Sequence, residues 1–287
     1  MKNAQIKSGV WPTMITPFTD AGEIDYGMVE KLIEWYIERG VAGIFAVCQS
    51  SEMFFLNDEE KVELAKFIVD HVNGRVGVVA SGHTADDFDQ QLRMVHAMAE
   101  TGADNIVLLP NRFAAAEEGD DVLMKHLEAF LAKVDPSISF GFYECPAPYK
   151  RVLTPEIMSF LADTGRFTFM KDTCCDAEQV KAKIKAGRGQ IKVFNANCSQ
   201  LLITLKEGEG TGLKIFNANA ATLLRSMEMG CAGYSGVMAN FHPEMYAWLC
   251  ANYAAQPELA QRVQNFLGLA SCIEARMYPV CAKKYLK

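Results

Sequence analysis

The stretch that decides the fold begins at Gly43–Cys48, which reads Gly-Ile-Phe-Ala-Val-Cys, and is followed by the helical pattern Asp58–Val72. The order then repeats: Arg75–Ser81 is a β-type run, Ala85–Glu100 is a helical pattern, and Asn105–Leu109 is a third β-type run. These runs are almost continuously apolar, as expected for strands buried on both faces of a parallel sheet. The stretch therefore predicts repeated strand–helix units.

The same alternation continues on both sides of this stretch. Further strands are expected at Gly9–Thr16, Ile138–Tyr143 and Phe167–Lys171. Further helices are expected at 25–39, 121–134 and 155–163. Such repeats build either a doubly wound sheet or an eight-stranded barrel. No Gly-x-Gly-x-x-Gly follows the first strand and no Gly-Lys-Ser/Thr loop occurs, so nucleotide folds have little support. The sequence predicts the α/β class and a (β/α)8 TIM barrel.

One unit is duplicated. Ile191–Asn197 reads Ile-Lys-Val-Phe-Asn-Ala-Asn, and Leu213–Asn219, 22 residues later, reads Leu-Lys-Ile-Phe-Asn-Ala-Asn. Two copies are too few for a solenoid. Because strand number, tilt and shear are coupled in a barrel, we expect one copy to supply the seventh strand and the other to lie outside the wall.

The last expected strand, Gly233–Met238, is followed directly by two helical patterns, Pro243–Ala254 and Glu258–Ala275. No linker separates them from the barrel. We therefore expect a barrel over residues 1–242, with the duplicated unit around 190–230, and a C-terminal helical appendage over residues 243–287.

Composition narrows the class of protein. Half of the 287 residues are hydrophobic and 22% are charged, which is ordinary for a globular chain. The net charge of −7 makes nucleic acid and anionic membranes poor partners. No apolar run is long enough for a membrane span, and the N-terminus lacks the apolar core of a secretory signal. Nine cysteines without a Cys-x-x-Cys pair predict reduced thiols in a cytoplasmic protein.

Candidate chemistry lies where the strands end, because barrel active sites form at that face. Lys171 ends the run Phe-Thr-Phe-Met-Lys, where burial favours a neutral amine that can attack a carbonyl. Alternatively, Lys171 forms an ordinary ion pair with Asp172 or a nearby glutamate at the rim of the barrel. Tyr143 ends the neighbouring strand, and its phenol can relay protons, or simply bond a carbonyl within the barrel.

Two loops add polar groups. Ser50 and Ser51 follow the second strand, and their hydroxyls and successive amides can hold a carboxylate. Arg112 follows the fourth strand and could bind an acidic group on a substrate, or be an exposed loop arginine. His83, after the third strand, is interpreted as a hydrogen-bonding residue.

Together these segments resemble the dihydrodipicolinate synthase and N-acetylneuraminate lyase family of pyruvate-using class I aldolases and dehydratases. Tyr143–Pro146 is similar to the Tyr-Asn-x-Pro motif, and Met170–Thr173 to the motif that carries the Schiff-base lysine. Gln49–Glu52 occupies the place of the Thr/Ser-Thr-Gly-Glu loop. Thr16–Phe18 and Gly233–Val237 match the opening and the last-strand pattern.

The resemblance implies a barrel with C-terminal helices, assembled as a homotetramer or homodimer. It implies that Lys171 forms an imine with a 2-oxo acid, that Tyr143 relays protons, and that Ser50 helps hold the carboxylate. The expected substrate-binding residues are Gln49, Ser51, Arg112 and Ser235. The imine is the electron sink, so neither a metal nor an organic cofactor is expected.

Three departures from the dihydrodipicolinate-forming members argue against lysine biosynthesis. Gln49 replaces a threonine, Asn111-Arg112 replaces a tyrosine pair, and Pro148 stands where spacing puts an arginine. Sialic acid lyases carry acidic residues after the seventh strand, where both copies here read Asn-Ala-Asn. The sequence thus predicts a Schiff-base lyase, an aldolase or dehydratase, acting on pyruvate or a 2-oxo-3-deoxy sugar acid. Its alternatives are a barrel that senses a 2-oxo acid, and a true dihydrodipicolinate synthase despite these losses.

Overall fold

Nine parallel strands form one sheet in this computed structural model, which describes residues 6–174, 177–187, 192–195, 216–217, 220–228 and 233–286. The strand order is β1-β9-β8-β7-β6-β5-β4-β3-β2. The strands are β1 (Gly9–Val10), β2 (Gly43–Ala46), β3 (Gly77–Ala80), β4 (Asn105–Leu108), β5 (Phe140–Tyr143), β6 (Phe167–Asp172), β7 (Lys192–Asn195), β8 (Phe216–Asn217) and β9 (Gly233–Tyr234).

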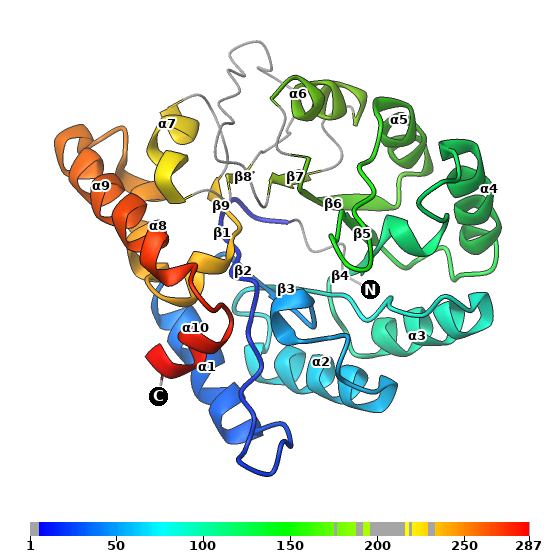
Figure 1. The fold of residues 1–287 in the computed structure, drawn as a ribbon, viewed down its shortest axis with the longest axis horizontal. Helices are drawn as coiled ribbons and strands as arrows, with labels where there is room; N and C mark the ends of the chain where they lie inside the picture. Colours follow the sequence, from blue (N-terminus) through cyan, green and yellow to red (C-terminus); the bar gives the residue numbers. More distant parts are fainter. Residues whose placement is uncertain are drawn as a thin grey trace.

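The sheet is curled, and residues around β1 hydrogen-bond to β2. The Val10 carbonyl accepts from the Ala42 amide at 2.8 Å, and the Met14 amide donates to the Phe45 carbonyl at 3.0 Å. Thr13 and Phe45 form a parallel bridge. Helices surround the curled sheet (Figure 1). The α/β class with a parallel sheet is therefore as the sequence predicts.

The described helices include all seven that the sequence placed, each close to its predicted range, and three for which it gave no range. They are α1 (Tyr26–Glu38), α2 (Asp58–Val72), α3 (Phe88–Glu100), α4 (Asp120–Leu131), α5 (Pro155–Thr164), α6 (Ala177–Ala186), α7 (Leu223–Glu228), α8 (Pro243–Asn252), α9 (Pro257–Glu274) and α10 (Val280–Tyr285). Short 3-10 turns follow some strands: η1 (Gln49–Ser51), η2 (Pro110–Arg112), η3 (Ala220–Thr222) and η4 (Val237–Asn240). No helix in the described ranges is long and apolar enough to cross a membrane.

The duplicated unit differs from its prediction. The first copy supplies β7 and the second supplies β8, and the two pair in one sheet through Phe194 and Phe216. The expectation that one copy lies outside the sheet is therefore wrong. Both copies carry the same Lys-x-Phe-Asn pattern, so both can pair as strands, and β8 adds only two residues to the sheet. The other residues of the two copies lie outside the described ranges.

Of the C-terminal helices, α8 packs against β1 and β9, and α9 packs against η3 and α7. The Gln264 side chain of α9 accepts from the Leu224 amide and donates to the Ala220 carbonyl, both at 2.6 Å. The last strand is shorter than expected, because the chain turns into η4 at Val237. The division of the chain at residue 242 stays a prediction.

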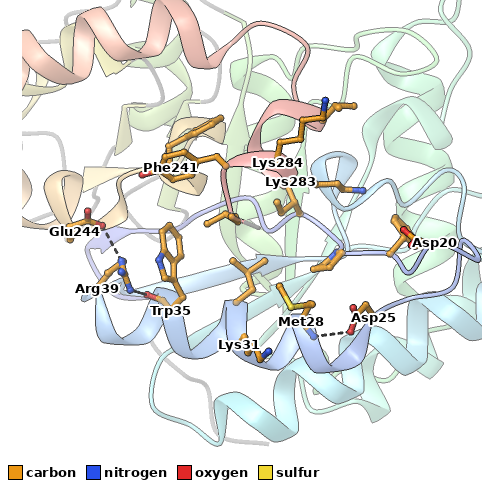
Figure 2. A pocket seen from close by; sticks show the side chains of 17 residues that line it. Asp20, Asp25, Met28, Lys31, Trp35, Arg39, Phe241, Glu244, Lys283 and Lys284 are labelled. Carbon is orange, nitrogen blue, oxygen red and sulfur yellow. Dashed lines mark hydrogen bonds and ion pairs between the residues drawn. The ribbon is translucent and has the colours of Figure 1, made fainter.

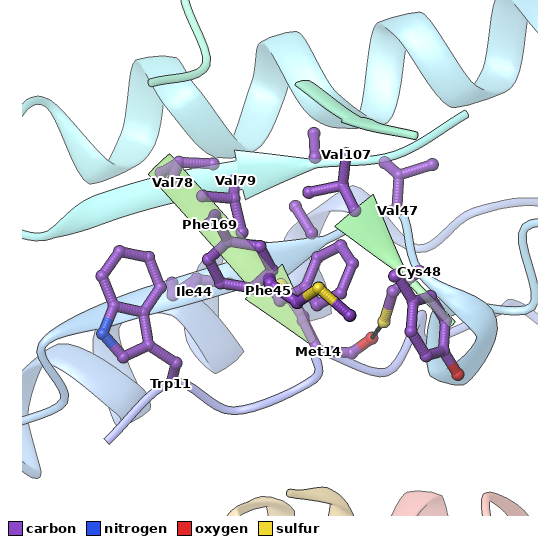
Figure 3. Packing of buried hydrophobic residues seen from close by; sticks show 14 of the residues in the cluster. Trp11, Met14, Ile44, Phe45, Val47, Cys48, Val78, Val79, Val107 and Phe169 are labelled. Atoms are coloured by element: carbon purple, nitrogen blue, oxygen red, sulfur yellow. Dashed lines mark hydrogen bonds between the residues drawn. The ribbon is translucent and has the colours of Figure 1, made fainter. Parts of the chain in front are cut away.

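Aromatic side chains fill the inside of the sheet (Figure 3). Trp11 is buried against the first residues of β2 and β3, where a Cβ on Gly43 would lie 2.2 Å from the indole. Glycine at this position thus makes room for the ring. Phe45 packs edge-on against Phe169, with centroids 5.7 Å apart. Phe45 also meets Tyr143 edge-on at 6.0 Å, so this core forms the floor beneath the strand ends.

Candidate active site

Lys171 and Tyr143 lie side by side at the ends of β6 and β5. They are register partners in the parallel pair, so their side chains point to the same face. Lys171 Nζ lies 4.3 Å from the centroid of the Tyr143 ring and 5.5 Å from that of Phe45. Both side chains are buried. The structure thus brings together the two residues that the sequence placed at the centre of the chemistry.

Burial lowers the pKa of Lys171, although the thiols of Cys48 and Cys145 partly oppose the shift. The predicted alternative, an ion pair at the rim, is not what the structure contains. Asp172 points to the opposite face of β6 and binds Lys183 at 2.6 Å. Within the described ranges, no carboxylate pairs with Lys171. The lowered pKa makes the neutral amine, which is the form that attacks a carbonyl, easier to reach than in an exposed lysine.

The Tyr143 hydroxyl donates a hydrogen bond to the Gln49 side-chain carbonyl at 2.9 Å. Burial raises the pKa of Tyr143 well above its ordinary value. The phenol therefore stays protonated at neutral pH and is suited to donate a proton. A primary amide accepts this hydrogen bond and holds the ring, but it does not pass a proton on as a hydroxyl can.

The loop after β2 forms η1 and uses its two serines differently. Ser50 is buried, and its Oγ lies 3.2 Å from Thr13 Oγ1. The Ser51 hydroxyl donates to the Met14 carbonyl at 2.6 Å and accepts from the Cys48 amide at 3.0 Å. The Ser51 amide donates to the Cys48 carbonyl. Ser51 thus stabilises the turn, and its hydroxyl and amide are already engaged.

The chain matches the model of the dihydrodipicolinate synthetase family over residues 7–286. It belongs to this family. Membership supports a pyruvate-dependent class I aldolase or lyase kind of function, as the resemblance implied.

Curated relatives are distant. The chain is 25% identical over 273 residues to a 4-hydroxy-tetrahydrodipicolinate synthase of Clostridium perfringens, covering 94% of this chain and 84% of the relative. It is 27% identical over 199 residues to the putative 2-dehydro-3-deoxy-D-gluconate aldolase YagE of Escherichia coli, covering 69% and 64%.

Solved structures share the fold. The structure of Escherichia coli YagE in complex with pyruvate superposes with a TM-score of 0.77 at 21% identity, covering 97% of this chain and 87% of that one. A dihydrodipicolinate synthase of Acinetobacter baumannii with pyruvate gives 0.76 at 23% identity, covering 98% and 87%.

Ser235 and Arg112 have structural partners in this family member. The buried Ser235 hydroxyl donates to the Trp11 carbonyl at 3.1 Å, which ties the end of β9 to β1. Arg112 forms an ion pair with Asp86, and its own side chain is only 9% exposed. The alternative interpretation of Arg112 as an exposed loop arginine is therefore wrong. That either residue binds substrate stays a prediction.

His83 is a hydrogen-bonding residue, as the sequence predicted. Its Nδ1 accepts from the Leu109 amide at 3.2 Å, and its ring stacks on Phe113 with centroids 4.9 Å apart. Burial lowers its pKa to about 3, so it stays neutral. His83 thus supports the loop after β4.

A buried ion cluster behind the site was missed from the sequence. Lys183 of α6 binds Glu144 and Asp172, each at 2.6 Å, and all three side chains are almost fully buried. Glu144, which stands in place of the motif's asparagine, also accepts from the Thr173 amide at 2.7 Å. Burial and Asp172 raise the pKa of Glu144 to about 7, whereas the two carboxylates raise the pKa of Lys183. The signal was that Glu144 and Asp172 directly follow the two site residues.

Asn111 was named only as a departure from the family, yet it shapes the loop after β5. Its side-chain amide donates to the carbonyls of Cys145, Ala147 and Tyr149 at 3.1, 3.0 and 2.6 Å. This fixes the loop that carries Pro148. In the described residues, no group of three His, Cys, Asp or Glu side chains could hold a metal ion.

A separate pocket of about 1140 Å³ lies between α1, the segment before it, and α10 (Figure 2). Neither Lys171 nor Tyr143 lines it. Lys283 of its wall forms an ion pair with Glu52, at the end of the Gln49–Glu52 loop. The pocket thus borders the site loop from outside.

Proposed function

We propose that this family member is a Schiff-base-forming lyase, an aldolase or dehydratase, that acts on pyruvate or a 2-oxo-3-deoxy sugar acid through Lys171. The observation that carries the proposal is a buried lysine with no carboxylate partner in the described ranges, 4.3 Å from the ring of a protonated tyrosine. We also propose that the curled sheet closes as a TIM-type barrel with both copies of the duplicated unit in its wall, which the hydrogen bonds between the β1 segment and β2 support.

The residues suggest how the imine forms. The neutral Lys171 amine attacks the ketone carbon, and the carbonyl oxygen becomes the hydroxyl of a carbinolamine. Tyr143 donates its proton to this hydroxyl, which leaves as water while the nitrogen lone pair forms the C=N bond. The protonated imine then accepts the electron pair of the bond that breaks, a carbon–carbon bond in an aldolase. The proton that the Lys171 nitrogen loses on addition goes to the carbonyl oxygen. The Tyr143 phenolate regains its proton from the substrate: in an aldolase from the hydroxyl that becomes the aldehyde carbonyl as the bond breaks, and in a dehydratase from the carbon next to the imine.

The departures from the dihydrodipicolinate-forming members support a 2-oxo-3-deoxy sugar acid as the substrate. Gln49 holds Tyr143 in place of a relay hydroxyl, and Asn111 fixes a loop in which Pro148 replaces the arginine. A relative is named as a putative aldolase of a 2-oxo-3-deoxy sugar acid, which supports this class. Other relatives are named 4-hydroxy-tetrahydrodipicolinate synthases, so that activity is the second candidate. Condensation of pyruvate with aspartate semialdehyde at about 1 per second or faster would favour it.

We propose a homo-oligomer, a dimer or tetramer, in the cytoplasm. Apolar side chains protrude from one face of α9: Phe266 is 45% exposed, Leu269 70% and Ile273 68%. Their spacing of three and four residues places them on one stripe. Contiguous exposed apolar surface of this kind marks an interaction site.

The test of the function is covalent trapping. The protein is incubated with pyruvate or a 2-oxo-3-deoxy sugar acid, reduced with borohydride, and digested for mass spectrometry. An adduct on Lys171 is expected, and a screen that scores pyruvate release against water loss separates aldolase from dehydratase. Binding without turnover would instead favour the sensor.

A further inference from the structure

The segment after α9 brings a tyrosine to the site loop. The Tyr278 hydroxyl accepts a hydrogen bond from Asn240 Nδ2 at 3.0 Å. It lies beside the side chains of Ser50 and Thr13, whose hydroxyl oxygens are 3.2 Å apart. Three hydroxyl groups thus converge from the end of the β1 segment, from η1 and from the C-terminal segment.

The donor directions suit an anion. Asn240 is fixed because it accepts from the Tyr36 hydroxyl and donates to the Thr13 carbonyl at 3.0 Å. Since Asn240 donates to the Tyr278 oxygen, the phenol proton is free to point into the cluster. Burial raises the pKa of Tyr278, so the proton is present at neutral pH. The cluster therefore offers rotatable hydroxyl donors.

The cluster is close to the reacting groups. Tyr278 lies near Tyr143 and near the Cys48 thiol, which is itself near Lys171. In a 2-oxo acid the carboxylate is bonded directly to the ketone carbon that the lysine attacks. A carboxylate bound at Ser50 therefore lies next to Tyr278.

We infer that Tyr278 is a substrate-binding residue that donates a hydrogen bond to the carboxylate of the 2-oxo acid, together with Ser50. This inference rests on the proposed function. The C-terminal segment would then contribute to the site, although it belongs neither to the family motifs nor to the ends of the strands.

Two further features hold the segment against the loop. Lys283 pairs with Glu52 and lies 4.4 Å above the Phe18 ring, so α10 is tied to the same loop that carries Ser50. Figure 2 shows Lys283 on this wall of the outer pocket. Met277, directly before Tyr278, has φ 56°, and Glu52 has φ 61°. Left-handed backbone at non-glycine residues persists where the surroundings enforce it, commonly at ligand sites.

The experiment compares Tyr278→Phe with the matched control Tyr285→Phe, since Tyr285 lies on α10 and is half exposed. Half-saturation of borohydride trapping is measured for pyruvate and for pyruvamide, which keeps the ketone but lacks the negative charge. Tyr278→Phe should raise the half-saturating pyruvate concentration by about 10- to 100-fold, as expected when a hydrogen bond to a charged group is lost. The value for pyruvamide should change much less, and Tyr285→Phe should change neither.

Partial unfolding would raise the half-saturating concentrations of pyruvate and pyruvamide by the same factor, so their ratio is unaffected by a modest loss of stability. Lys283→Met is a second variant, which keeps the Tyr278 hydroxyl but frees α10 from Glu52. It should shift the pyruvate-to-pyruvamide ratio in the same direction and by less. If wild-type protein is trapped but Tyr278→Phe leaves the ratio unchanged, Tyr278 is only structural and the inference fails. If no 2-oxo acid is trapped on the wild type, the proposed function itself fails.

Discussion

The Tyr143 hydroxyl donates its hydrogen bond to the side-chain carbonyl of Gln49, 2.9 Å away. This contact fixes the phenol above Lys171, whose amine lies 4.3 Å from the ring centroid. Gln49 stands where dihydrodipicolinate-forming relatives are expected to carry a relay threonine. An amide at this position orients the phenol but cannot take over its proton. Under the proposed function, Tyr143 therefore exchanges protons with the substrate itself.

This arrangement predicts unequal effects of two substitutions. Tyr143→Phe should slow imine formation by roughly 10²–10⁴, because the proton donor is lost, while some trapping remains. Gln49→Ala should slow it by only about tenfold, because it removes one hydrogen bond that orients the donor. Rapid-quench trapping with borohydride measures both rates. Equal losses in the two variants would show that Gln49 does more than orient Tyr143.

The strands were predictable because of their burial. Runs such as Gly43–Cys48 are apolar throughout, since both faces of the parallel sheet are covered, and the polar residue that ends each run marks the active face. Lys171 and Tyr143 could be found in this way. The place of the second copy of the duplicated unit in the sheet could not be predicted, because a sequence pattern does not say how many strands a sheet accepts.

The other residues of the site depend on tertiary contacts. Lys183 is one of several lysines in α6, and only packing shows that it is the one buried between Glu144 and Asp172. Tyr278 is more than 200 residues from Ser50 in the chain. The turn-closing role of Ser51 could not be predicted, because a serine that closes a turn and one that binds a ligand look alike in sequence.

The buried cluster behind the site predicts a large loss of stability. Lys183→Met would leave Glu144 and Asp172 buried without their cation, which should lower the free energy of unfolding by about 3–5 kcal/mol. Lys185→Met is the control, because Lys185 lies on the same helix and is exposed. Urea unfolding followed by circular dichroism measures the difference. A loss below about 1 kcal/mol in Lys183→Met would contradict the assignment of the cluster as a buried ion network.

The same cluster predicts a pH dependence. Burial and Asp172 raise the pKa of Glu144 from 4.5 to about 7 in the folded protein. Between these values the unfolded chain has released the proton that the folded protein still holds, so rising pH favours unfolding. The contribution of Glu144 is thus fully present below pH 4.5 and is lost as pH rises through 7. The free energy of unfolding should fall more between pH 5 and pH 7.5 in the wild type than in Glu144→Gln.

Glu59→Gln provides the control for this comparison, because Glu59 is exposed in the first turn of α2. It should keep the pH slope of the wild type. An identical slope in the wild type and in Glu144→Gln would mean that Glu144 is not protonated in the folded protein over this range.

The exposed stripe on α9 predicts the assembly. Leu269→Glu with Ile273→Glu places two charges where apolar side chains would be buried between subunits, so the mass in solution should fall by half or more at a fixed concentration. Gln261→Glu adds a charge to the same helix away from the stripe and should leave the mass unchanged. Light scattering after size-exclusion chromatography measures both. A wild type that is already monomeric, or a double variant of unchanged mass, would exclude this face as the interface.

The last prediction concerns the nucleophile. Lys171→Ala should abolish trapping and turnover together, since in the described part of the chain Lys171 is the amine that lies over the Tyr143 ring. Lys171→Arg should fail equally, because a guanidinium stays protonated and cannot form an imine. Both variants should keep their thermal unfolding midpoint close to that of the wild type, because Lys171 has no ion-pair partner in the described part of the chain. Lys150→Ala is the control, since this exposed lysine follows the neighbouring strand. Mass spectrometry of the reduced adduct identifies the modified lysine. Modification of Lys150 or of Lys192 in the wild type would show that Lys171 is not the nucleophile, even if the protein turns over a 2-oxo acid.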